Sequence, residues 1–120
     1  VIRDCDSKAI GAIADEITGI SERARTKGLA MNEMTGGCFT LSSLGHIGGT
    51  GFTPVINAPE VAILGICRTQ DRFLPDASGK PVLRQLLPLS LSYDHRVING
   101  AAAAQFVCAI AQYLGDFDFS

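Results

Sequence analysis

The feature that most constrains the fold is a strand-like segment joined to a helical segment by a short polar link. Residues 82–93 are apolar and then alternate serine with leucine, which indicates a mostly buried strand. Residues 101–114 are rich in alanine, and their larger apolar side chains recur at helical spacing, so we predict a helix there. Because both ends of the link are anchored in regular structure, it can hold polar side chains rigidly.

The link contains more polar chemistry than a turn requires. Within six residues it presents a carboxylate, an imidazole, a guanidinium and an amide, from Asp94, His95, Arg96 and Asn99. Asn99 is suited to cap the following helix, and the partial positive charge at a helix N-terminus disfavours a protonated imidazole nearby. A neutral imidazole can accept a proton, so His95 is a candidate general base. The alternative is a structural loop histidine that is hydrogen-bonded to the backbone.

The first third of the chain has a helical pattern between short irregular segments. Val1–Arg3 is a candidate strand, and Ser7 can cap a helix whose apolar face spans residues 10–24. Gly28 is the expected stop of this helix, after a basic last turn. Residues 32–37 are typical of a turn, with room for one turn of helix.

From residue 38 the pattern becomes that of β-structure. Strands are predicted at 38–43 and 61–67, and the glycine-rich loop 44–51 between them lacks the residues of a phosphate-binding loop. A turn at 76–81 makes a hairpin between a strand that ends near Thr69 and the strand that precedes the polar link. This order predicts an α+β fold, a two-layer sandwich with helices packed on a mixed or antiparallel sheet.

Charge and cysteine spacing argue against several functional classes. A net charge of -2 gives no support for nucleic-acid binding, and no apolar run approaches the roughly 20 residues that span a bilayer. The cysteines lack the paired spacing of metal sites, so we expect no metal and reduced thiols in or near the core. Reduced thiols and a charged first segment, unlike a secretory leader, favour the cytoplasm or the mitochondrial matrix. These cysteines are Cys5, Cys38, Cys67 and Cys108.

Four motifs along the chain identify a family. Leu91–Gly100 is similar to a histidine signature usually written DHRxxDG, and Gly36–Gly45 to a strand that contains threonine and serine. Asn57–Gly65 and Val1–Asp4 match two further segments, in the same order. Together they resemble the dihydrolipoamide acyltransferases, the core components of 2-oxo acid dehydrogenase complexes. The residues of these motifs most resemble those of the acetyl-transferring members from bacterial pyruvate dehydrogenase complexes.

The resemblance implies a chloramphenicol acetyltransferase-like fold, of which residues 1–120 would form the C-terminal half of the catalytic domain. It implies transfer of an acetyl group between dihydrolipoyl groups and coenzyme A, the lipoyl group being carried on another domain. The expected partners are further copies, as a trimer that builds a larger core, and the lipoyl domain. Pyruvate dehydrogenase and dihydrolipoamide dehydrogenase subunits would bind through the full-length protein.

Site roles follow from the same resemblance. His95 would be the general base and Ser42 the oxyanion donor, contributed by a neighbouring subunit, with Ser43 as the adjacent alternative. Asn99 stands where the family commonly has Asp, so it could orient the histidine without adding charge, or serve only as a helix cap. Without the resemblance, Ser42 would be a strand hydroxyl bonded to nearby backbone. No direct catalytic role is expected for His46.

Two other functions are consistent with the sequence. A truncated homologue could have lost catalysis and serve as an assembly or scaffold module of a 2-oxo acid dehydrogenase complex, which the partial domain and Asn99 would fit. A cysteine-based enzyme would instead need a thiol of low pKa.

Overall fold

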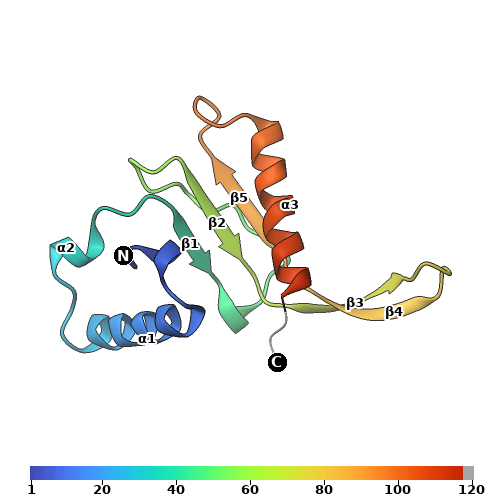
Figure 1. The fold of residues 1–120 in the computed structure, drawn as a ribbon, viewed down its shortest axis with the longest axis horizontal. Helices are drawn as coiled ribbons and strands as arrows, with labels where there is room; N and C mark the ends of the chain where they lie inside the picture. The colour runs from blue at the N-terminus through green and yellow to red at the C-terminus, as the bar shows by residue number, and fades with distance from the viewer. Residues whose placement is uncertain (118–120) are drawn as a thin grey trace. The chain divides into compact units, whose positions relative to one another are not determined.

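The computed structural model describes residues 1–117, which fall into two compact units, Val1–Cys38 and the part of the chain from Phe39 onward. The first unit is helical, and the second contains all the strands and the last helix (Figure 1). No helix among residues 1–117 is both long and apolar enough to cross a membrane.

The first unit contains a short 3₁₀ helix, Cys5–Ser7, and two α-helices, α1 (Ile10–Thr26) and α2 (Met31–Met34). Gly28 lies just beyond the end of α1 with φ 77°, the left-handed conformation that terminates helices, so the predicted stop is confirmed. The turn of helix expected within 32–37 is present as α2.

Two predictions for the beginning of the chain are wrong. Val1–Arg3 forms no strand, because no segment within residues 1–117 pairs with it, and the Arg3 guanidinium instead donates to backbone carbonyls of Asn32 and Thr35. Ser7 does not cap α1, because it is the last residue of the 3₁₀ helix, where its hydroxyl donates to the Asp4 carbonyl at 2.8 Å. The N-cap of α1 is Ala9.

A mixed three-stranded sheet organises the second unit. Its strands are β1 (Thr40–Ser43), β2 (Ala62–Ile66) and β5 (Leu89–Tyr93), with β2 in the centre, parallel to β1 and antiparallel to β5. The continuous apolar sequence of β2 suits a central strand covered on both faces, and its residues Ala62 to Gly65 are all buried. The buried strand predicted at 61–67 is therefore confirmed.

Helix α3 (Gly100–Asp116) packs along β5 and covers one face of this sheet (Figure 1). Ala103 of α3 is buried, and the ring of Phe106 meets that of Phe39 edge-on at 5.7 Å. In β2, a Cβ at Gly65 would lie 2.7 Å from the Phe52 ring, so glycine is needed where this ring lies. The result is the predicted α+β arrangement of helix on mixed sheet.

The predicted hairpin exists, but its strands differ from those expected. Among the described strands, β3 (Gln70–Pro75) and β4 (Pro81–Leu86) pair only with each other, and the expected long strand 82–93 is split between β4 and β5. Pro88 lies at the break, where a residue without an N–H cannot continue a ladder. The sequence did not predict the first hairpin strand, because the side chains of this polar segment are mostly exposed and show no apolar pattern.

The prediction that the cysteines lie in or near the core is wrong for three of the four residues. Only Cys67 is buried; Cys5, Cys38 and Cys108 are exposed. All four are free thiols. The helix and loop positions of the other three place them at the surface, which the apolar character of their sequence neighbours did not reveal.

Candidate active site

The polar link between β5 and α3 is a short loop fixed to the sheet. The Asp94 amide donates to the Val61 carbonyl at 2.8 Å, and the Asp94 carbonyl accepts from the amides of Val97 and Ile98. His95 therefore projects from a segment with anchored backbone, and its side chain is exposed. An exposed imidazole on a rigid loop is accessible to a substrate or to another protein copy.

Asp94 and Arg96 form an ion pair within this loop. The Asp94 carboxylate accepts from the Arg96 side chain at 2.6 Å and 2.9 Å, and also from the Arg96 backbone amide at 3.0 Å. These bonds hold the pKa of Asp94 at about 2, below its usual value of 3.8. The Arg96 side chain is 88% exposed and the Asp94 side chain only 21%, so solvent still screens the pair through Arg96, and its role is to fix the loop shape around His95.

Because the folded-state pKa of Asp94 is depressed, the stabilisation from this pair is present above pH about 4 and is lost as pH falls toward 2. We expect the Asp94 carboxyl carbon to titrate near pH 2 when followed by NMR. Arg96→Gln should move this titration up toward pH 3.8, whereas Arg84→Gln, on the distant hairpin, should leave it unchanged. An Asp94 titration that is insensitive to Arg96→Gln would contradict the assigned cause.

Asn99 is the N-cap of α3. Its side-chain Oδ1 accepts from the Ala102 amide at 2.8 Å, while its own carbonyl accepts from the Ala103 amide. Among residues 1–117, no hydrogen bond joins Asn99 to His95. In one copy of the chain the amide thus orients the helix start and leaves the imidazole unbound.

Asn99→Ala should therefore destabilise the protein by about 1 kcal/mol, since a cap acceptor is lost. Asn99→Asp keeps the acceptor and should unfold within a few tenths of a kcal/mol of the parent chain in urea. Equal stability of the alanine and aspartate variants would show that the cap contributes nothing.

Ser42 and Ser43 have different environments at the end of β1. The Ser43 hydroxyl accepts from the Gly45 amide at 3.1 Å, which fixes the entry into the glycine-rich loop. The Ser42 hydroxyl makes no hydrogen bond among residues 1–117, and its residue is half-buried. Alternation along the strand directs the two side chains to opposite faces. Ser42 is thus the hydroxyl that remains available to a ligand.

The sheet register keeps Ser42 far from His95 within one copy. Ser42 is level with Gly65 of β2, and Gly65 is level with Ser90 of β5. From Ser90 the strand runs three residues to Tyr93, about 10 Å, and two strand spacings add about another 10 Å sideways. A single copy of the chain does not bring the predicted base and the predicted oxyanion donor together.

Tyr93 is a neighbour of His95 that the sequence analysis did not single out. The two ring centroids lie 5.6 Å apart, with the ring planes tilted by 40°. The sequence feature that could have identified Tyr93 is its position two residues before His95, at the end of an alternating strand.

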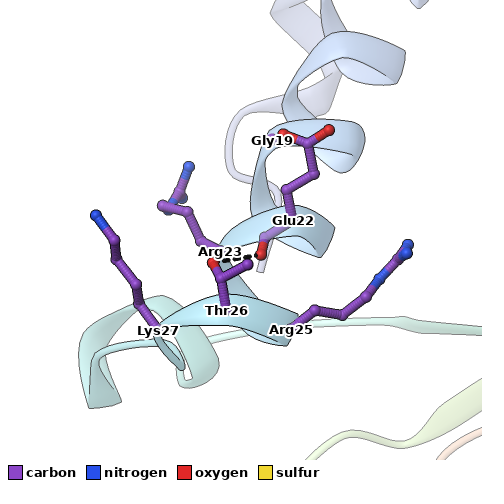
Figure 2. Close-up of a pocket in the computed structure, with 6 residues that line it drawn as sticks. All are labelled: Gly19, Glu22, Arg23, Arg25, Thr26 and Lys27. Carbon is purple, nitrogen blue, oxygen red and sulfur yellow. Dashed lines mark hydrogen bonds between the residues drawn. The ribbon is translucent and has the colours of Figure 1, made fainter.

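Two further places in the described residues carry polar side chains but no catalytic arrangement. His46 lies in the short 3₁₀ helix Gly45–Ile47 and is exposed. A cavity of about 410 Å³ lies at the end of α1, where the Arg25 and Lys27 side chains extend in different directions (Figure 2). It has no convergent nucleophile and base. Within residues 1–117, no group of three His, Cys, Asp or Glu side chains could hold a metal ion.

Comparison with known proteins gives consistent matches. Residues 1–119 match the 2-oxoacid dehydrogenases acyltransferase (catalytic domain) family. The chain is 52% identical over 120 residues to the dihydrolipoyllysine-residue acetyltransferase component of the pyruvate dehydrogenase complex from Buchnera aphidicola subsp. Acyrthosiphon pisum. That match covers 99% of this chain and 30% of the relative.

Two solved structures share the fold. One is described as an investigation of the roles of a serine, a histidine and an asparagine in the catalytic mechanism of Azotobacter vinelandii dihydrolipoamide acetyltransferase; it has TM-score 0.91 and 50% identity. The other is the cubic core of the pyruvate dehydrogenase multienzyme complex, with TM-score 0.91 and 51% identity. Each match covers 96% of this chain and 47% of the other, so the chain spans about half of either structure.

Proposed function

Because the chain belongs to the 2-oxoacid dehydrogenase acyltransferase family, we propose that it transfers an acetyl group between dihydrolipoyl thiols and coenzyme A. The relatives are acetyltransferase components of the pyruvate dehydrogenase complex, and the chain spans less than a third of the length of the Buchnera relative. We place residues 1–120 as the C-terminal half of such a catalytic domain, since they cover about half of the solved cores.

His95 is the general base of this proposal. A thiol has an ordinary pKa of about 8.5 and is mostly protonated at neutral pH, so its attack needs a group that removes the proton. The imidazole of His95 takes the proton from the coenzyme A thiol as the sulfur bonds to the thioester carbonyl carbon. When the intermediate collapses, the carbon–sulfur bond to the dihydrolipoyl group breaks, and the imidazolium returns the proton to the leaving sulfur.

Ser42 is the oxyanion donor. The tetrahedral intermediate places negative charge on the former carbonyl oxygen, and a hydroxyl aimed at that oxygen stabilises it. Ser42 suits this role because its hydroxyl is free within residues 1–117, whereas the Ser43 hydroxyl is engaged by the Gly45 amide. This difference in hydrogen bonding supports Ser42 over its neighbour.

The residue spacing of the Azotobacter enzyme supports the histidine and the asparagine and leaves two positions for the serine. Its asparagine follows its histidine by four positions, as Asn99 follows His95 here. Its serine precedes the histidine by 52 positions, whereas Ser43 lies 52 and Ser42 lies 53 positions before His95. One extra residue between the serine and the histidine of this chain would align Ser42. Separate alanine variants therefore have to decide between the two serines.

The active site combines two copies of the chain. The observation that supports this most strongly is the sheet register, which separates Ser42 and His95 within one copy while His95 stays exposed. A trimer, repeated in a larger core, would bring His95 of one copy to Ser42 of its neighbour. Coenzyme A and a lipoyl group delivered by another domain are the substrates.

Mixing two inactive variants tests this arrangement. His95→Ala and Ser42→Ala chains, each inactive alone, should regain transfer when refolded together, because some sites then receive an intact histidine from one copy and an intact serine from the other. Random assembly makes about a quarter of the sites intact in a cyclic arrangement. The assay is acetyl transfer from acetyl-CoA to dihydrolipoamide, with native mass measured on the same samples.

The controls separate the possible failures. A chain with both substitutions, refolded with either single variant, should stay inactive, since no site can then combine both groups. If each single variant is inactive and the mixture is too, although mixed oligomers form, the two-copy site is wrong. If the parent chain assembles but neither binds coenzyme A nor transfers acetyl groups, the chain is a scaffold module.

A further inference from the structure

We propose that Tyr93 is a positioning residue that fixes the orientation of the His95 imidazole for proton transfer. This inference rests on the proposed function, in which His95 is the general base. In this inference, the exposed His95 ring is kept in place by an aromatic contact with Tyr93 of the same copy of the chain.

The first observation is how few groups hold His95. Neither ring nitrogen of His95 has a hydrogen bond among residues 1–117, and the side chain is exposed. The polar neighbours are engaged elsewhere: the Asp94 carboxylate with Arg96, and the Asn99 Oδ1 with the helix amide of Ala102. The Tyr93 ring, 5.6 Å away between centroids, is the side chain that the structure places against the imidazole.

The second observation is that Tyr93 is itself well fixed. It is the last residue of β5, paired with buried Ala62 of the central strand, and it is half-buried. Its hydroxyl lies at the first residue of α3, where a Cβ at Gly100 would be 3.5 Å from the oxygen. The ring therefore extends from the end of the sheet to the start of the helix and lies against His95.

The physical consequence is a restricted imidazole. An exposed histidine without hydrogen bonds samples several rotamers. The ring must reach the rotamer that faces the thiol before it can take the proton. Aromatic rings in tilted contact favour a limited set of relative orientations. Misplacement of a catalytic group by about 1 Å can cost about 100-fold in rate, so even this modest restriction affects turnover.

The test compares Tyr93→Leu with Tyr93→Phe. Leucine removes the aromatic face, and we expect kcat for acetyl transfer to fall about 10- to 100-fold while KM for coenzyme A and for dihydrolipoamide stays within about twofold. Phenylalanine keeps the face and should retain kcat within about threefold. The NMR shifts of the His95 ring protons report the contact directly: the ring-current shift should vanish in Tyr93→Leu and persist in Tyr93→Phe.

Each other outcome overturns the inference. If Tyr93→Leu keeps parental kcat while His95→Ala is inactive, Tyr93 does not position the base, and the proposed function stands. A loss in Tyr93→Phe equal to that in Tyr93→Leu would assign the effect to the hydroxyl and reject the aromatic contact. If His95→Ala itself remains active, the proposed function fails, and the ring-proton shifts still show whether the contact exists. Circular dichroism and native mass confirm that the variants fold and assemble.

Discussion

His95→Ala is expected to lower the rate of acetyl transfer by about 100- to 10,000-fold, the usual contribution of a positioned general base. The loss arises because a thiol with a pKa of about 8.5 supplies little thiolate at pH 7 without a base. The measurement is the initial rate from acetyl-CoA to dihydrolipoamide. His46→Ala is the matched control, since His46 is also exposed and lies in a separate short helix, and it should keep the parental rate.

The pH dependence separates a base from a structural histidine. As pH rises toward the ordinary pKa of the thiol, the thiolate forms unaided, so the deficit of His95→Ala should shrink between about pH 7 and pH 9. A deficit that stays constant over this range would indicate a role in binding or folding. A rate within about threefold of the parent chain at pH 7 would reject His95 as the base.

Ser42→Ala is expected to lower kcat by about 100- to 1,000-fold with little change in KM, because an oxyanion donor acts on charge that exists only in the transition state. Ser43→Ala is the control on the adjacent residue. It removes the acceptor for the Gly45 amide and should alter loop stability more than kcat. Steady-state kinetics of both variants on the assembled protein provide the comparison.

The opposite result would move the assignment by one residue. If Ser43→Ala loses kcat while Ser42→Ala keeps it, then Ser43 is the donor, as the 52-residue spacing in the Azotobacter enzyme allows. If neither variant changes kcat by more than about threefold, the oxyanion is stabilised by other groups, such as backbone amides.

Most errors in the sequence analysis concern segments that lack an apolar signal or a partner. Strand β3 was missed because hairpin strands with exposed, mixed side chains have no buried face to produce alternation. The strand expected at Val1–Arg3 is absent because a strand needs a neighbour, and strand propensity does not supply one. Burial of the cysteines was misjudged because sequence neighbours do not report which side of an element faces solvent.

The sequence by itself determined what depends on near neighbours. The Asn99 cap and the stop at Gly28 each involve groups within a few residues, so residue type and spacing were sufficient to predict them. The order of motifs was also sufficient to identify the family.

Only the tertiary structure decided where the two catalytic candidates lie relative to each other. Their separation within one copy follows from the register that aligns Ser42 with Gly65 and Gly65 with Ser90, and such pairing depends on contacts between distant segments. Pairing and packing over long sequence distances cannot be derived from local propensity, because each strand has several possible neighbours until the whole sheet forms.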